Sequence, residues 1–343
     1  MSALLDVQDL RKTFGGSRTL LGAPRPEVRA VDGISFTLAR GETLGLVGET
    51  GSGKSTLGRL VLRLIEPSAG HVRFEDADVT GASTRALRAM RPRMQMVFQD
   101  PYGSLDPRMT AGAIIAEPMT AHGIGRAEAA RRAAELLAQV GLSPAMAARY
   151  PHEFSGGQRQ RIGIARAIAL DPSLVVLDEP VSALDVSVQA QILNLLAEIQ
   201  ARSGVAFLFI AHDLGVVRHV SDRVAVMYLG RVVEMAPRDT LYAAPRHPYT
   251  VSLLAAVLRP DPRRERGRPR IRPIGEIGSA ASLPTGCRFH PRCPRAREVA
   301  ARGGDTAEAE GTRLPTACVR QDPLLAPSGG ATHFAACHFP NED

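Results

Sequence analysis

Residues 48–55, which read GETGSGKS, constrain the fold of this chain more than any other segment. They fit the G-x-x-x-x-G-K-[ST] loop, whose backbone N–H groups surround phosphate oxygens. Only Lys12 and Lys54 are lysines among the 42 basic residues. A compact ammonium reaches between phosphate oxygens better than a planar guanidinium does, which fits the lysine at position 54. The residues predicted to bind nucleotide phosphate and its Mg²⁺ are Gly48, Gly51, Gly53, Lys54, Ser55 and Thr56.

The flanking residues predict a strand that enters this loop and a helix that leaves it. Residues 42–47 (ETLGLV) are mostly apolar, as in a strand of a buried sheet. Apolar residues then recur with the i, i+3, i+4, i+7 spacing of a helix that ends at Pro67 and Gly70. The predicted apolar face of this helix consists of Leu57, Leu60, Val61 and Leu64. The pattern indicates an α/β fold.

Two acids follow a second buried strand. Residues 174–177 (LVVL) are continuously apolar and lead directly into Asp178 and Glu179. Adjacent acids taken alone are typical of a solvated turn. After a buried strand, and with a phosphate loop in the same chain, a catalytic interpretation is favoured. We expect Asp178 in the magnesium shell and Glu179 as the general base for an attacking water.

Two further polar residues follow apolar strands. His212 comes after residues 205–210 (VAFLFI), and Gln99 follows residues 94–98. A lone histidine is more often structural than catalytic. Here both residues are expected at the same sheet edge as Asp178. The predicted roles are a γ-phosphate contact for His212, and a metal or water contact for Gln99.

The turn Ser155-Gly156-Gly157-Gln158 opens another predicted helix. A serine hydroxyl, two glycines and a helix N-terminus present N–H donors to an anion. Because the chain already holds a complete phosphate loop, this second turn needs a separate purpose.

Composition limits the other classes of function. An apolar content of 44% and a charged content of 22% are those of a soluble globular protein, and 343 residues suit one large and one small domain. No apolar run approaches the roughly 18 residues of a membrane span. Asp6 and Asp9 interrupt the start, so we expect no signal peptide.

The net charge of +7 does not predict nucleic-acid binding. Seven arginines lie between Arg259 and Arg272, in a proline-rich segment without apolar periodicity. A solvated linker is the favoured interpretation, with acidic lipid headgroups as the functional alternative. Tryptophan is absent and no aromatics are interleaved for base stacking, so no nucleic-acid partner is expected.

The order of phosphate loop, Gln99, FSGGQ, LVVLDEP, Ser182–Asp185 and His212 resembles the nucleotide-binding subunit of an ABC transporter, over about residues 4–250. The resemblance implies ATP and Mg²⁺ as ligands. It implies a P-loop NTPase fold with a RecA-like core, an antiparallel β-subdomain and an α-helical subdomain at about residues 100–160. Within that range, Glu128–Val140 reads as an amphipathic helix closed by Gly141.

The same resemblance assigns roles across a head-to-tail dimer. In that family the signature turn of one subunit caps the γ-phosphate held by the other. Ser155, Gly156, Gly157 and Gln158 would therefore act in trans, with Asp185 at the dimer seam. His212 would contact the γ-phosphate in cis, and Phe14 would stack on adenine.

The C-terminal part, from HPYT at 247–250 to the segment PTGCRFHPRCP at 284–294, resembles the extension of dipeptide and oligopeptide importer ATPases, most closely the second of their two ATPase subunits. This implies a second, different ABC ATPase, two transmembrane permease subunits and an extracytoplasmic solute-binding protein as partners. It implies a peripheral location on the cytoplasmic face of the inner membrane. Import of nickel chelates or another small solute remains an alternative. A soluble ABC ATPase acting on ribosomes or DNA, and an exporter, are the rivals from other classes.

The expected division is an ATP-binding domain at 1–250 and a linker with C-terminal extension at 251–343. All four cysteines lie in that extension, namely Cys287, Cys293, Cys318 and Cys337. Their spacing matches no standard zinc or ferredoxin pattern, so an iron–sulfur or zinc site and free structural cysteines are equally favoured. Arg295–Thr316 is expected to be longer and less ordered than the corresponding part of the relatives.

Overall fold

The computed structural model describes residues 3–16, 27–256, 278–309 and 311–341. The arginine-rich segment Arg259–Arg272 lies outside these residues. In the described part of the chain the larger sheet has eight strands, in the order β13-β14-β10-β9-β3-β8-β7-β6. Its central pairs are parallel, whereas β9–β10, β10–β14 and β13–β14 are antiparallel. The bounds are β3 Thr43–Val47, β6 Met94–Val97, β7 Leu174–Asp178, β8 Ala206–Ala211, β9 Arg223–Tyr228, β10 Arg231–Pro237, β13 Ala326–Pro327 and β14 Phe334–Ala335.

The central strands are buried on both faces. Every residue of β3, β7 and β8 is buried, as expected for parallel strands covered on each side. Side chains alternate between two hydrophobic cores, since Val175 and Leu177 belong to one and Leu174 and Val176 to the other. Parallel strands end at a common edge, so Asp178 and the residue after β8 emerge together.

A second, antiparallel sheet covers one face of the larger sheet. Its four strands within the described residues follow the order β2-β1-β4-β5. Their bounds are β1 Leu5–Phe14, β2 Val28–Leu38, β4 Ala69–Phe74 and β5 Ala77–Asp78. Helix α1 (Lys54–Val61) packs with this sheet through Leu57, Leu60 and Val61. The prediction that Leu64 belongs to this apolar helical face is wrong: Arg63 turns to a φ of 47°, and Leu64 is 47% exposed.

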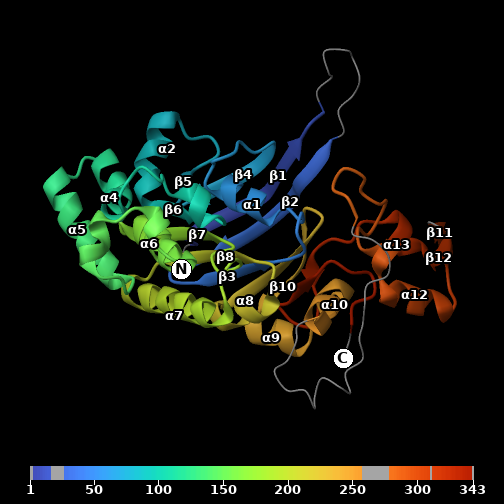
Figure 1. The fold of residues 1–343 in the computed structure, drawn as a ribbon. Helices are drawn as coiled ribbons and strands as arrows, with labels where there is room; N and C mark the ends of the chain where they lie inside the picture. Colours follow the sequence, from blue (N-terminus) through green and yellow to red (C-terminus); the bar gives the residue numbers. More distant parts are fainter. Residues whose placement is uncertain (1–2, 17–26, 257–277, 310, 342–343) are drawn as a thin grey trace, which may run out of the picture.

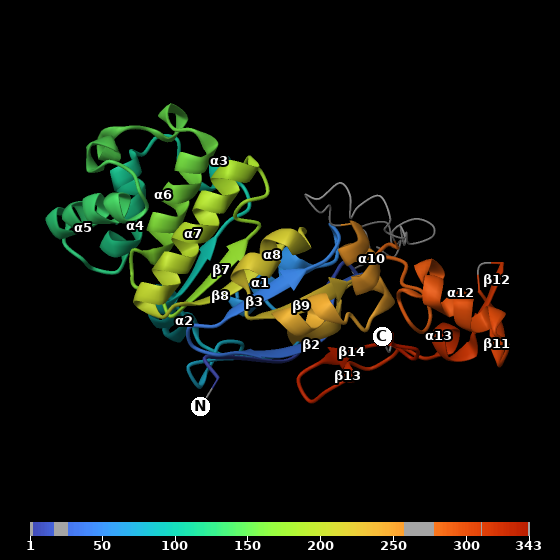
Figure 2. The same ribbon diagram turned by 90° about the horizontal axis from the view of Figure 1, so that it is seen from below.

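Helices cover the other face and extend to one end of the molecule (Figures 1 and 2). The α-helices between α1 and the tail are α2 Thr84–Met90, α3 Pro101–Ser104, α4 Ala111–Ala121, α5 Arg126–Gln139, α6 Gly156–Ile168, α7 Val186–Ser203, α8 Leu214–Val220, α9 Arg238–Ala243 and α10 Pro248–Ala256. Short 3-10 turns are η1 Arg91–Arg93, η2 Pro144–Ala148 and η3 Pro151–Glu153. Gly141 follows the end of helix α5 with a φ of 77°. This left-handed conformation is the one expected of a glycine that closes a helix.

The tail, residues 278–341, lies at the opposite end of the molecule from α4 and α5 (Figures 1 and 2). Its elements are η4 His290–Arg292, α12 Pro294–Ala301, β11 Thr306–Ala309, β12 Thr312–Pro315, α13 Thr316–Arg320, β13 and β14. Within Arg295–Thr316 the described residues form α12 and the paired strands β11 and β12, with Ala296 and Leu314 buried, and whether this segment is longer and less ordered than in the relatives stays a prediction. Strand β14 joins the larger sheet through the pairs Glu234–Ala335 and Met235–Phe334. The tail is therefore docked on the sheet edge.

Among the described residues, no helix combines the length and apolar character needed to cross a membrane.

Candidate functional site

The phosphate loop runs from the end of β3 to the start of α1. Gly53 has a φ of 103°, and a Cβ there would lie 2.0 Å from the Ala30 carbonyl oxygen, so only glycine fits. Gly51, at a φ of 81°, faces open space. The first turn of α1, which begins at Lys54 and has no side-chain cap, leaves backbone N–H groups without helical partners beside this loop.

Lys54 is buried inside the loop. Its Nζ donates hydrogen bonds to the carbonyl oxygens of Gly48 at 2.7 Å and Glu49 at 2.9 Å. Burial lowers the pKa of Lys54, against the opposing effect of the Glu179, Asp178 and Glu49 carboxylates. The ammonium is thus held by the backbone that would surround a phosphate. Thr56 follows as a half-buried residue in the first turn of α1.

Ser55 and Asp178 form the next part of the site. Ser55 Oγ donates to Asp178 Oδ1 at 2.7 Å. Asp178 is fully buried, and its Oδ2 has no hydrogen-bond partner among the described residues. Burial raises the pKa of Asp178, and the Ser55 hydrogen bond works against that rise. A hydroxyl beside an unpartnered carboxylate oxygen is a donor set that Mg²⁺ accepts, so these residues fit the metal.

Glu179 lies close to two other polar residues that follow the ends of neighbouring strands. Gln99 Nε2 donates to Glu179 Oε2 at 3.1 Å, and His212 Nδ1 lies 3.4 Å from the same oxygen. Glu179 has a φ of 47°, a left-handed conformation that is costly for a residue with a side chain. Its backbone N–H donates to the Ile210 carbonyl oxygen at 2.9 Å and holds that conformation. The sheet therefore brings Gln99, Glu179 and His212 together.

The Ser155–Gln158 turn is a separate, self-contained feature. Ser155 Oγ accepts from the Gln158 N–H at 3.4 Å, and Gln158 Oε1 accepts from the Ser155 N–H at 3.0 Å. This capping box fixes the start of α6. A Cβ on Gly157 would lie 2.5 Å from Val188, whereas Gly156 has more room. Across the described ranges, no hydrogen bond or ion pair joins this turn to residues 48–55.

Asp185 and Phe14 lie at exposed positions. Asp185 caps α7 by accepting from the Val188 N–H at 2.9 Å, and Ser187 Oγ donates to it at 2.6 Å. The Ser187 hydrogen bond is the main cause that lowers the pKa of Asp185. The adjacent Val186 is 82% exposed. Phe14 is 40% exposed, and Lys12 Nζ lies 5.0 Å from its ring centroid.

The four cysteines come from separate segments of the tail, and Cys287, Cys293 and Cys318 are buried while Cys337 is half-buried. Burial is the main cause that raises the pKa of Cys287, and the other three thiols add to that rise. Burial raises the pKa of Cys293 to about 11 and the pKa values of Cys318 and Cys337 to about 12. Within the described ranges, however, no group of three or more His, Cys, Asp or Glu side chains could hold a metal ion. All four cysteines have free thiols.

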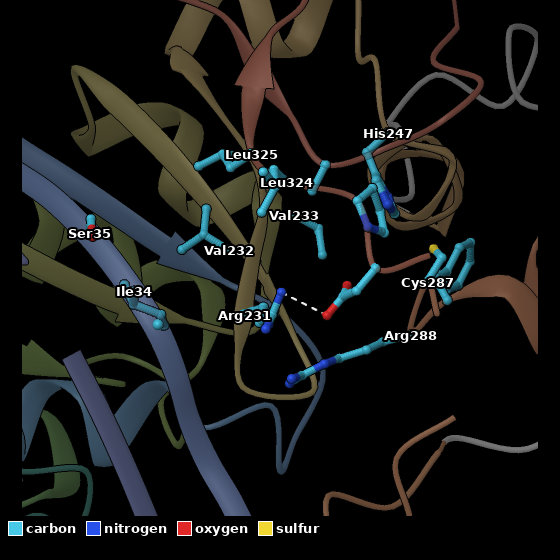
Figure 3. Close-up of a pocket in the computed structure, with 15 residues that line it drawn as sticks. Ile34, Ser35, Arg231, Val232, Val233, His247, Cys287, Arg288, Leu324 and Leu325 are labelled. Carbon is cyan, nitrogen blue, oxygen red and sulfur yellow. Dashed lines mark ion pairs between the residues drawn. The ribbon is translucent and has the colours of Figure 1, made fainter. Parts of the chain in front are cut away.

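A cavity of about 250 Å³ lies between β2, β10 and the tail (Figure 3). Arg231, Val232, Val233 and Arg288 line it, and Arg231 Nη1 pairs with Asp322 at 2.7 Å. Of the residues predicted from the sequence to form a site, Cys287 alone lines this cavity. The cavity is thus a feature of the tail interface and not of the phosphate loop.

Sequence reasoning missed the contacts that hold the loop from outside. Glu49 occupies a variable position of the motif, yet Arg292 of the tail pairs with its carboxylate and Tyr249 of α10 accepts from its N–H. Tyr249 and Arg292 lie 200 and 243 residues from Glu49 in the sequence, so no local pattern reveals these contacts.

Comparisons with known proteins identify the family of this chain. Residues 31–182 match the family model described as ABC transporter, and residues 233–299 match the one described as oligopeptide/dipeptide transporter, C-terminal region. The chain is 47% identical over 338 residues to the oligopeptide transport ATP-binding protein AppF of Bacillus subtilis, covering 98% of this chain and 97% of the relative. It is 56% identical over 295 residues to a probable peptide ABC transporter ATP-binding protein of Sinorhizobium fredii, covering 86% and 83%.

A solved structure gives the same fold. It is a dimeric ATP-binding cassette in a post-hydrolysis state, bound to ADP and Pi. The TM-score is 0.61 at 26% identity, and the match covers 68% of this chain and 98% of that one.

Proposed function

This chain belongs to the ABC transporter ATP-binding proteins of the oligopeptide and dipeptide importer family, and from that membership we propose that it hydrolyses ATP to drive peptide import across a membrane. The observation that carries the proposal is the Ser55–Asp178 pair, with its unpartnered carboxylate oxygen beside the phosphate loop. The match of the tail to the oligopeptide/dipeptide model supports peptide over nickel chelates or another small solute.

The chemistry needs one proton transfer. Ser55 Oγ and Asp178 would hold Mg²⁺, which offsets negative charge on the phosphate oxygens when bound. Gly48, Gly51, Gly53, Lys54 and Thr56 would surround the phosphates, and Phe14 would stack on adenine. Glu179 would take the proton of the water that attacks the γ-phosphorus, so that ATP and water give ADP and phosphate. Gln99 and His212 would orient that water and the γ-phosphate.

We also propose that the Ser155–Gln158 turn acts on a partner's nucleotide. The turn is closed by its own capping box, and among the described residues no hydrogen bond or ion pair joins it to its own chain's phosphate loop. Asp185 and the exposed Val186 would then lie at the seam between two ATPases. The proposed partners are a second, different ABC ATPase, two permease subunits and a solute-binding protein. We propose that the chain acts on the cytoplasmic face of the inner membrane. We propose a division near residue 250, which is supported by the match of two different family models to residues 31–182 and 233–299.

The function is tested on protein purified from its native membranes in mild detergent. We expect two permease subunits and a second ATPase to co-purify, and peptide-loaded binding protein to raise ATP hydrolysis several-fold. Stimulation by a nickel chelate, with none by peptides, would favour the alternative solute. Co-purifying ribosomes or DNA, with no permease, would contradict an import function.

For the tail thiols we propose an iron–sulfur cluster, with a zinc site and free structural cysteines as the alternatives. Cys287, Cys293 and Cys318 are buried, Cys337 is half-buried, and all four carry free thiols. Four thiolates are the ligand set of an iron–sulfur cluster. Cys287, Cys293, Cys318 and Cys337 would each supply one thiolate.

We expect anaerobically purified protein to contain iron and acid-labile sulfide in equal amounts, and Cys293→Ser to lose most of both. Metal analysis and visible absorption provide the measurement. The matched control is Ser279→Ala, a hydroxyl change in the same tail away from the thiols. Protein free of iron and sulfide after anaerobic purification would contradict the cluster.

A further inference from the structure

The second residue of the phosphate loop is held by residues far beyond the loop. Arg292 Nη1 and Nη2 donate to the two Glu49 carboxylate oxygens at 2.9 and 3.2 Å. The Glu49 N–H donates to Tyr249 Oη at 2.9 Å. A two-bond guanidinium–carboxylate pair fixes orientation as well as distance. Glu49 is therefore held both through its side chain and through its backbone.

Arg292 can fix Glu49 because the tail that carries it is itself fixed. Arg288 forms a buried ion pair with Asp32 of β2. The Phe289 ring lies 5.4 Å from Tyr228 and 5.3 Å from Tyr249, measured between centroids. Figure 3 shows Arg288 extending from the tail toward Arg231, the first residue of β10. Arg292, in the adjacent turn η4, is itself buried.

The position of Glu49 matters to the whole loop. Its carbonyl oxygen accepts from Lys54 Nζ at 2.9 Å and from the Ser52 N–H at 3.1 Å. Its carboxylate is close enough to Lys54 to affect the pKa of that residue. A negative charge here opposes a bound triphosphate, and the Arg292 guanidinium offsets that charge.

We propose that Arg292 is a positioning residue for ATP binding. It neutralises Glu49 and holds the phosphate loop in its binding shape from the tail of the same chain. The inference rests on the proposed function, namely that residues 48–55 bind ATP. If Arg292 has this role, the C-terminal extension takes part in the nucleotide site.

The test measures the dissociation constant for Mg-ATP by calorimetry on the full chain, and KM and kcat in the assembled transporter. We expect Arg292→Ala to raise the dissociation constant and KM roughly tenfold, less than the loss of a partner from a fully buried pair would, because the Glu49 side chain is 20% exposed. The kcat at saturating ATP should stay within about twofold, since Arg292 does not reach the reacting atoms. Arg292→Lys keeps the positive charge and loses the two-bond geometry of the guanidinium. Its dissociation constant should therefore lie between those of the wild type and Arg292→Ala.

Removing the charge that Arg292 balances should restore binding. In the Glu49→Gln/Arg292→Ala double variant we expect a dissociation constant within about threefold of the wild-type value, because no uncompensated carboxylate remains. Arg295→Ala is the matched control, since Arg295 pairs with Glu298 of its own helix. It should bind ATP as the wild type does.

Each outcome decides a separate claim. Unchanged binding in Arg292→Ala, with a wild-type protein that binds ATP, would overturn the inference. Weak binding that Glu49→Gln does not restore would also overturn it, because loss of tail docking would then be the cause. A wild-type chain that does not bind ATP would instead contradict the proposed function.

Discussion

Glu179→Gln is expected to lower ATP hydrolysis at the site on this chain's phosphate loop by about 100-fold or more, the usual effect of losing a general base. The amide keeps the size of the side chain and its contact distance to Gln99 and His212. ATP affinity should therefore stay within about twofold. The measurement is the nucleotide retained by the washed transporter after turnover, which should be ADP in the wild type and ATP at this site in the variant.

The matched control is Glu66→Gln, the same chemical change at an exposed acid that pairs with Arg63. It should turn over as the wild type does. Conversion of ATP to ADP at the wild-type rate in Glu179→Gln would remove Glu179 from the role of base.

The same variant provides a test of the turn that acts in trans. Mg-ATP should trap Glu179→Gln as a closed ATPase pair, detectable by size-exclusion chromatography of the two ATPases. Adding Ser155→Arg should prevent trapping and leave ATP binding to this chain intact. Loss of ATP binding to the chain itself would show that the turn acts in cis.

Lys54→Met is expected to raise the dissociation constant for ATP by roughly 10- to 100-fold, and hydrolysis should fall with it. Hydrogen bonds to charged groups contribute about 1.5–3 kcal/mol, and each 1.4 kcal/mol is a factor of ten. Methionine fills the buried space of the lysine stem, so the loop stays packed. Calorimetric titration with Mg-ATP gives the constant, and thermal unfolding without nucleotide checks the fold.

The control for loss of one basic charge is Arg40→Met. Lys12 is the other lysine, but it lies 5.0 Å from the Phe14 ring, so it is close to the proposed adenine contact. Arg40 is exposed and pairs with Glu75. Wild-type affinity in Lys54→Met would contradict the assignment of the phosphate loop.

Elements with a strong local signal were predictable from the sequence. The strand, glycine loop and helix at residues 43–61 follow from apolar spacing and glycine positions. The hydrophobic spacing predicts Leu64 on the helical face, but the backbone turns one residue earlier, at Arg63. No proline or glycine stands at Arg63 to signal that turn in the sequence. The composition of Arg295–Thr316 does not predict α12 or the pairing of β11 with β12. The packing of Ala296 and Leu314 into the tail is seen only in the tertiary structure.

The sequence alone determined which residues meet at the sheet edge. Parallel strands end at the same edge, so polar residues after 97, 178 and 211 had to emerge together, whatever the details of packing. Tertiary structure alone decided what holds the phosphate loop from behind. The Arg292–Glu49 pair depends on how a tail more than 200 residues away docks on the sheet, and no periodicity or spacing encodes such a contact. Local backbone preferences depend on each residue and its neighbours in the sequence. A long-range ion pair, in contrast, forms only once the intervening chain has folded.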